Sequence, residues 1–452
     1  MYKGKRAAPS PRPRLPLPAA LALAALLAVA GLLAAFNAGG PSRPGGAVPS
    51  PTVQPTPAPT PATTPEPEPT PSPAPDPAEE LLAGMTLYEK ACQLLVVKPS
   101  AITGVSRVTA AGETTRAALE RYPVAGLLYD DTNLVTMEQA KTMLANVQGY
   151  SKIPLILTCD EEGGRVNRLM HTIGTTYIGP MLDYKDQGVD KAAENARTIA
   201  ADLAACGFNM DLAPVADVWS NRANTAIGDR AYSDDFQQAA QLVSAAVGGF
   251  HEGGVACTLK HFPGHGDTSA DSHYGSVYVY KTLDELRGAE LVPFRAGIEA
   301  GADAVMLGHL IMADIDEQPA LFSHKVVTGL LREELGFGGV VITDSLDMRA
   351  ITDHYGSGEI AVAAIQAGVD LLLCPQDLDE TIGAITQAVE DGTIPRQRLD
   401  ESVLRVLRLK LERGILKRSG IEKRGGMTAS RPVLFFSAAP RRTLSPASPK
   451  RI

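Results

Sequence analysis

The sequence predicts an α/β fold in which eight βα units close into a TIM-type (β/α)8 barrel. Eight short apolar runs alternate with helical patterns in the middle of the chain, as expected for sequential βα units. Polar residues gather where several of these runs end, and a barrel carries its active site at that edge. Both ends of the 452-residue chain are too rich in Pro or basic residues to form a core. We therefore expect one catalytic domain over residues 79–417.

The predicted strands are runs of four to six mostly apolar residues: Leu94–Val97, Val124–Tyr129, Pro154–Cys159, Asn209–Leu212, Val255–Leu259, Ala304–Leu307, Val340–Thr343 and Val369–Cys374. Helical spacing of apolar residues between and after them predicts Met137–Val147, Ala192–Cys206, Phe236–Glu252, Leu283–Ala300, Val326–Leu335 and Glu401–Arg413. A doubly wound open sheet is the alternative. The strand count and the chemistry at the strand ends favour the barrel.

Residues 1–40 have the pattern of a signal peptide or an N-terminal membrane anchor. Five Lys and Arg residues precede an apolar segment, Leu15–Phe36, which as a helix would measure roughly 33 Å. Ala28-Val29-Ala30 is a possible cleavage site, whereas the length of the apolar segment favours a retained anchor. Either reading predicts an extracytoplasmic enzyme, membrane-anchored or secreted and associated with the cell wall.

The segments that flank the catalytic domain are expected to be disordered. Residues 41–78 contain fifteen prolines, a composition that favours extended polyproline II and suits a stalk. Residues 418–452 are basic and contain Pro and Ser. We interpret them as a solvated tail, with contact to anionic wall polymer or lipid as the alternative.

Charge and cysteine content exclude some classes of protein. The net charge is -9 and the globular region has no basic block, so nucleic acid is not an expected partner. The five cysteines are far apart and mostly lie in apolar runs, which predicts buried thiols rather than disulfides.

The segment Lys260–Gly275, KHFPGHGDTSADSHYG, concentrates reactive side chains. Its glycines permit close backbone approach, and it follows the predicted fifth strand, so we expect a loop at that strand's C-terminal end. Asp160–Arg168, Asp217, Gly228–Arg230 and Thr343–Asp347 follow other predicted strands. Their carboxylates and arginines suit a polyhydroxylated substrate. Singly, such an Asp is more often a helix N-cap, and such an Arg can be a surface ion pair.

Five runs in order, DEEGGRVNR, DLAPVADV, IGDRAY, KHFPGHGDTSADSHYG and VVITDSLDM, resemble glycoside hydrolase family 3, specifically its β-N-acetylglucosaminidase branch. The resemblance covers about Leu81 to Leu416. It implies a barrel enzyme, needing no metal or cofactor, that removes terminal β-linked N-acetylglucosamine (GlcNAc), typically from peptidoglycan fragments. Many family members carry a second α/β sandwich domain, which we do not expect in this chain. We also expect a monomer.

The resemblance also implies roles for individual residues. Asp344 matches the nucleophile position, and Asp271 and His273 match an Asp-His dyad that replaces the usual carboxylic acid. The positions that hold the sugar are Asp160, Arg168, Arg230, Lys260 and His261.

Chemistry supports the same assignment independently. A retaining glycosidase needs an anionic nucleophile and a proton donor that later acts as a base. A histidine with a free pKa of about 6.5 can serve in both steps, and an Asp two residues away can orient it. The alternative for His273 is a loop histidine bonded to backbone. We expect His265 to shape the loop, and His309 either to line the pocket or to pack.

Three further hypotheses remain from the sequence. A metal-dependent hydrolase would use five potential ligands: His261, His265, Asp267, Asp271 and His273. A second alternative is a wall-bound sugar receptor that has lost activity, in which Asp344 and the Asp271–His273 dyad would have no catalytic role. GlcNAc phosphorolysis would use the same site, because a histidine donor tolerates an anionic acceptor better than a carboxylate does.

Overall fold

The computed structural model describes residues 76–268 and 277–417. Its strands are short and buried: β1 Leu95–Val97, β2 Gly126–Leu128, β3 Ile156–Cys159, β4 Met210–Asp211, β5 Thr258–Phe262, β6 Val277–Val279, β7 Ala304–Leu307, β8 Leu310–Met312, β9 Val340–Thr343 and β10 Leu372–Leu373. All eight predicted strands are present, although several are shorter than predicted. Strand β5 is shifted along the sequence.

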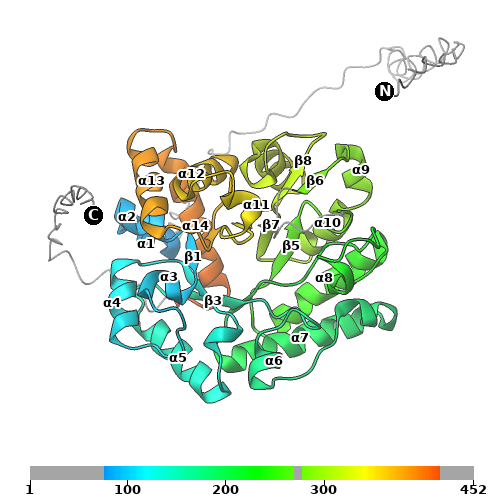
Figure 1. Cartoon of the computed structure of the whole chain (residues 1–452), viewed down its shortest axis with the longest axis horizontal. Helices are drawn as coiled ribbons and strands as arrows, with labels where there is room; N and C mark the ends of the chain where they lie inside the picture. The colour runs from blue at the N-terminus through cyan, green and yellow to red at the C-terminus, as the bar shows by residue number, and fades with distance from the viewer. Residues whose placement is uncertain (1–75, 269–276, 418–452) are drawn as a thin grey trace, which may run out of the picture. The chain divides into compact units, whose positions relative to one another are not determined.

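Helices lie around the outside of these strands (Figure 1). They are α1 Pro77–Ala83, α2 Leu87–Cys92, α3 Pro99–Thr103, α4 Glu113–Arg121, α5 Met137–Tyr150, α6 Leu169–Ile173, α7 Val189–Cys206, α8 Phe236–Glu252, α9 Leu283–Gly288, α10 Leu291–Glu299, α11 Arg349–Thr352, α12 Ser357–Ala367, α13 Leu378–Glu390 and α14 Arg396–Glu412. A π-helix, η5, spans Lys325–Glu334. No helix within the described ranges has the length and hydropathy needed to cross a membrane.

The strands pair in parallel in three groups. Five form a sheet in the order β10-β1-β2-β3-β4, three form β5-β7-β9, and β6 pairs with β8. Single parallel bridges lie between the two larger sheets, from Met210 to Ala256 and from Ile342 to Leu371. The predicted α/β class with parallel strands is therefore confirmed.

Several predicted bounds differ from those of the structure by a few residues, and two predictions were wrong in kind. The stretch from Lys260 does not begin as a loop, because Lys260, His261 and Phe262 belong to β5. The expected single helix Leu283–Ala300 is two helices, α9 and α10. Pro293 explains the second difference: it has no N–H to donate within a continuous helix, and it is tolerated in the first turn of α10.

The paired strands β6 and β8 were not predicted. They contain three residues each, which is too short for a periodic pattern to be recognised.

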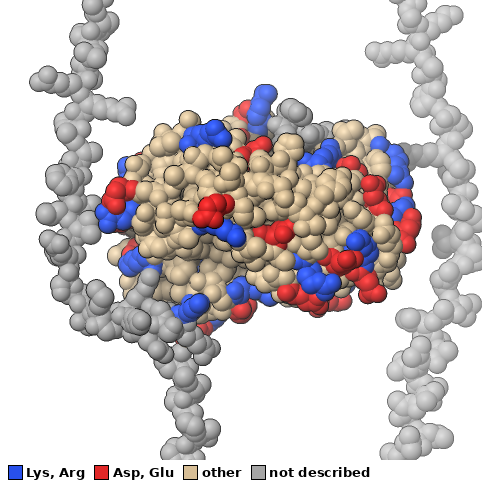
Figure 2. Space-filling model, turned by 90° about the horizontal axis from the view of Figure 1, so that it is seen from below, with Lys and Arg blue, Asp and Glu red and all other residues tan. Residues whose placement is uncertain are grey.

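Acidic and basic side chains are interspersed over the face of the molecule shown in Figure 2. The five cysteines are free and buried, as predicted.

Candidate active site

A cavity of about 460 Å³ lies at the carboxyl ends of the parallel strands. All six described residues that the sequence analysis assigned to the site line it: Asp160, Arg168, Arg230, Lys260, His261 and Asp344. They come from β5 and from the connections that follow β3, β4 and β9. The two other predicted residues, Asp271 and His273, lie outside the described residues.

Lys260 connects two of the three acidic residues that follow β3, Asp160 and Glu162. Its ammonium lies 2.7 Å from Asp160 Oδ1 and 2.6 Å from Glu162 Oε1. The Lys260 side chain is only 2% exposed, so these ionic contacts are little screened by water. Burial opposes charge on this ammonium, but the two carboxylates outweigh it and raise the pKa of Lys260 above its ordinary value.

Arg230 holds Glu162 from a second direction. Its guanidinium makes two hydrogen bonds to the carboxylate, with Nε 2.8 Å from Oε2 and Nη2 2.8 Å from Oε1. Burial raises the pKa of Glu162, but the charges of Arg230 and then Lys260 dominate and lower it far below its ordinary value. Glu162 is therefore a fixed anion between two cations.

The Asp160 side chain lines the cavity and is only partly covered by its ionic partners. Arg168 Nη2 lies 3.3 Å from Asp160 Oδ2, and about a quarter of the Asp160 side chain is exposed. Burial raises its pKa, whereas Lys260 and then Arg168 have the larger combined effect and lower it. An ionised carboxylate in this position can accept hydrogen bonds from substrate hydroxyls.

Glu161, between these two acids, has a structural role. Its carboxylate accepts hydrogen bonds from the backbone N–H groups of Arg168, Leu169 and Met170, which satisfies donors at the start of α6. Burial raises the pKa of Glu161 despite these bonds. Because alternate residues of an extended chain point to opposite sides, only its neighbours face the cavity.

His261 is held by Asp217, which follows β4. Its Nδ1 lies 2.6 Å from Asp217 Oδ2, so Nε2 is the ring nitrogen left to interact with a ligand. The other oxygen of Asp217 accepts from the backbone N–H of His265 at 2.6 Å. Burial raises the pKa of Asp217, but the two histidines, His261 first, lower it overall.

His265 shapes the loop, as predicted. Its ring lies 2.7 Å from Thr268 Oγ1 and is buried. The glycine after it is required by close packing: a Cβ on Gly266 would lie 1.7 Å from the backbone oxygen of Val218.

Asp344 directly follows β9 and is half-buried at the cavity. Its backbone N–H donates to the carbonyl of Leu307 at 2.9 Å, and its Oδ1 accepts from the backbone N–H of Ser345 at 2.7 Å. The first bond ties Asp344 to the end of the adjacent strand β7, and the second holds its carboxylate against the following backbone. Lys98 and Asp347, paired at 2.8 Å, form another part of the cavity wall.

All residues that line the cavity, from Lys98 to Leu373, lie within the part of the chain that matches a known protein family. Residues 86–409 match the Glycosyl hydrolase family 3 N terminal domain. The chain belongs to glycosyl hydrolase family 3. It is therefore an enzyme that hydrolyses glycosidic bonds.

Individual relatives of this family 3 glycosidase are similar over more than half of the chain. A beta-hexosaminidase of Stenotrophomonas maltophilia (strain K279a) is 37% identical over 276 residues, which are 59% of this chain and 81% of the relative. A beta-N-acetylglucosaminidase structure from Paenibacillus matches with a TM-score of 0.69 and 36% identity, covering 77% of this chain and 65% of that one. A beta-N-acetylhexosaminidase structure from Beutenbergia cavernae matches with a TM-score of 0.64 and 28% identity, covering 73% and 99%.

The sequence analysis of this glycosidase missed two residues that organise the cavity. Glu162 was read only as part of the DEEGGRVNR run, and Asp217 only as a polar residue after a strand. Both are nearly fully buried, and a charged residue is rarely buried without a partner. Glu162 could have been found from its position two residues after Asp160, because alternate residues of an extended chain point to the same side.

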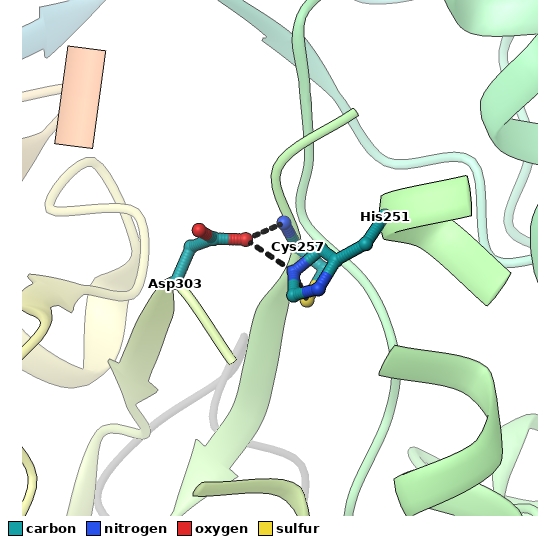
Figure 3. A group of neighbouring side chains, drawn as sticks. All are labelled: His251, Cys257 and Asp303. Carbon is teal, nitrogen blue, oxygen red and sulfur yellow. Dashed lines mark hydrogen bonds and ion pairs between the residues drawn. The ribbon is translucent and has the colours of Figure 1, made fainter. Parts of the chain in front are cut away.

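The sequence analysis also considered a metal site built from five potential ligands. The three of these residues that the structure describes each contact a different partner. His261 bonds Asp217, His265 bonds Thr268, and Asp267 pairs with Lys281 at 2.9 Å. Within the described ranges, the one group with metal-compatible spacing is His251, Cys257 and Asp303 (Figure 3).

That group lies at the amino ends of β5 and β7, opposite the cavity. Asp303 Oδ2 contacts His251 Nε2 at 2.9 Å and accepts from the backbone N–H of Cys257 at 3.0 Å. Its other oxygen contacts the guanidinium of Arg413. Both carboxylate oxygens are thus occupied, and the cluster joins α8, β5, β7 and the end of α14 as a hydrogen-bonded junction.

Proposed function

We propose that this glycoside hydrolase is an exo-acting, retaining β-N-acetylglucosaminidase. One observation supports it most: Asp344 shares its cavity with the Asp160–Glu162–Lys260 network and Arg168. This arrangement offers an anion beside a fixed set of donors and acceptors suited to sugar hydroxyls. The named activities of the Stenotrophomonas and Paenibacillus relatives support the choice of N-acetylhexosamine.

In the first step, the Asp344 carboxylate attacks the anomeric carbon and the bond to the leaving oxygen breaks. The imidazolium of His273 gives its proton to that oxygen. In the second step, neutral His273 takes a proton from water, which attacks the anomeric carbon and releases Asp344. Asp271 orients the imidazole and stabilises its charged form.

The remaining cavity residues hold the sugar in this proposal. Asp160 accepts hydrogen bonds from hydroxyls, while Arg168 and Lys260 donate to sugar oxygens. Arg230 acts mainly through Glu162, and His261 presents Nε2. Because the network is prearranged by buried ion pairs, little ordering is needed when the sugar binds.

For the fold, we propose that β1, β2, β3, β4, β5, β7, β9 and β10 together form a (β/α)8 barrel. The parallel bridges Met210–Ala256 and Ile342–Leu371 support closure, because they lie at the two places where the larger sheets meet. The active-site residues would then occupy the C-terminal edge of that barrel.

For the biological substrate, we propose GlcNAc-containing muropeptides released from peptidoglycan, acted on by a monomer outside the cytoplasm. The N-terminal apolar segment and the proline-rich stretch after it support this location.

The deciding experiment is product analysis on defined muropeptides with and without inorganic phosphate. The proposal expects free GlcNAc with retained β-configuration at early times, unchanged by phosphate. GlcNAc 1-phosphate as the main product would establish phosphorolysis instead. Absence of any GlcNAc-containing product, also from a chromogenic β-N-acetylglucosaminide, would refute the activity.

A further inference from the structure

A second, smaller cavity of about 190 Å³ lies beside the catalytic one. Its lining includes Tyr278 of β6, His309 after β7, Ile311 of β8 and residues of the segment 350–355. His309 Nε2 lies 2.9 Å from the backbone oxygen of Ser345, and Ser345 lines the catalytic cavity. A hydrogen bond therefore links a residue of the second cavity to the segment that follows Asp344.

Tyr278 of β6 and Tyr280, which follows the strand, form an exposed aromatic face, and Tyr278 lines the second cavity. Tyr278 is 53% exposed and Tyr280 is 72% exposed. The alternating residues Val277 and Val279 are buried. The two rings are nearly parallel, with an interplanar angle of 16° and centroids 6.3 Å apart. Large exposed aromatic side chains grouped beside a cavity are characteristic of a ligand-binding surface.

The other walls suit a polyhydroxylated ring. Ile311, Pro319 and Ile351 provide apolar surface, while Glu317 and His354 provide polar groups. Tyr355 is fixed by an edge contact with Phe322, with ring centroids 5.0 Å apart. A pyranose has an apolar C–H face that packs on an aromatic ring and hydroxyls around its edge that need donors and acceptors.

The charges around this cavity are mixed. Glu317 lies in its wall, Lys325 donates to the backbone oxygen of Ile315 nearby, and Arg349 is paired with Asp353 at 3.1 Å. The described charged groups around this cavity are thus of both signs, which fits a neutral sugar.

We propose that this second cavity binds the sugar ring on the leaving-group side of the scissile bond, with the ring stacked on Tyr278. The inference rests on the proposed function, since it requires cleavage between two sugars. Two facts favour the leaving-group side: the cavity adjoins the segment after Asp344, and Tyr278 follows closely in sequence after His273, the proposed donor to the leaving oxygen.

The test compares two substrates with equally unactivated leaving groups: methyl β-N-acetylglucosaminide and the β-1,4-linked GlcNAc disaccharide. Only the disaccharide has a second ring. We expect Tyr278→Ala to lower kcat/KM for the disaccharide about tenfold, which corresponds to a loss of about 1.4 kcal/mol of stacking, and to change kcat/KM for the methyl glycoside by less than twofold. Tyr278→Phe should keep most of the disaccharide rate, because it keeps the ring.

Tyr177→Ala is the matched control, because Tyr177 is also highly exposed, at 74%, and lines neither cavity. It should leave both rates unchanged. An equal effect of Tyr278→Ala on both substrates, or no effect on either, would overturn the second sugar site. A wild-type enzyme that releases GlcNAc from neither substrate would instead refute the proposed function, so the two failures are distinguishable.

Discussion

Lys260 Nζ lies 2.6 Å from Glu162 Oε1, and both side chains are almost completely buried, at 2% and 3% exposed. The pair joins β5 to the segment after β3, across nearly a hundred residues of sequence. Since Glu162 also binds Arg230, loss of this carboxylate would leave two buried cations without their common anion. The cavity wall therefore depends on a residue that need not touch the sugar.

Glu162→Gln is expected to destabilise the fold and to reduce activity. Breaking a buried ion pair by removing one partner costs about 3–5 kcal/mol, so the denaturation midpoint should fall markedly, together with kcat/KM. Glu113→Gln is the control, because that side chain is 80% exposed and its ion pair among the described residues is with Arg116 on its own helix turn. It should change the unfolding free energy by less than about 0.5 kcal/mol.

The effect of Glu162→Gln should depend on pH. The folded-state pKa of Glu162 is lowered from its ordinary value of 4.5, so its charge stabilises the fold above that pH, and this contribution is lost as the pH falls toward the lower folded-state pKa. The stability difference between wild type and variant should shrink below about pH 4.5. A difference that stays constant across that range would contradict the assignment.

Arg168→Ala is expected to lower kcat/KM by about tenfold or more. The guanidinium donates charge-assisted hydrogen bonds, each of about 1.5–3 kcal/mol, and Arg168 lines the cavity while also binding Asp160. Steady-state kinetics on a chromogenic β-N-acetylglucosaminide would measure the change, and thermal unfolding would check that the fold is kept. An unchanged kcat/KM in both Arg168→Ala and Lys260→Ala would argue against the proposed sugar pocket.

Asp344→Ala should lose nearly all turnover while keeping the fold. A slow fluorinated glycoside should form a covalent adduct on Asp344 of the wild-type enzyme, because the second step is slowed more than the first. Peptide mass mapping would identify the labelled residue. Label on a different carboxylate would move the nucleophile elsewhere.

His273→Ala should discriminate between leaving groups. A second sugar departs poorly without a proton, whereas an activated nitrophenolate departs without one, so the glycosylation step should slow severely for the first and much less for the second. Asp271→Ala should show a milder form of this pattern. Equal slowing of both substrates would show that His273 is not the acid/base residue. Asp267 would then be the first alternative to test.

Lys410→Met should change how stability depends on pH. Lys410 in α14 is buried, its ammonium lies 3.1 Å from Gln93 Oε1, and burial lowers its pKa to about 7. Between that value and the ordinary 10.5, the unfolded chain binds the proton more strongly, so this residue makes stability rise with pH. Wild type should gain stability relative to Lys410→Met from pH 7 to pH 10 in denaturant unfolding. A constant difference would show that the buried amine does not titrate there.

Much of the fold could be predicted from the sequence, because strands and helices follow local periodicity. Strands β7 and β9 and helix α8 have the predicted bounds. The position of Asp344 after an apolar run also placed it at a strand end, where the structure has it. Helix α10 shows where periodicity fails, since Pro293 restarts the helix without interrupting the apolar pattern.

The tertiary structure alone decided which charges pair. The sequence has three consecutive acidic residues after β3. In the structure, Asp160 and Glu162 form ion pairs with Lys260 of β5. Glu161 instead accepts hydrogen bonds at the start of α6. The same holds for Asp217, which became the partner of His261 because β4 and β5 are adjacent. Local sequence determines which side chains stand at strand ends. The distances between strands determine which of them meet, because an ion pair strengthens steeply as separation and solvent exposure decrease.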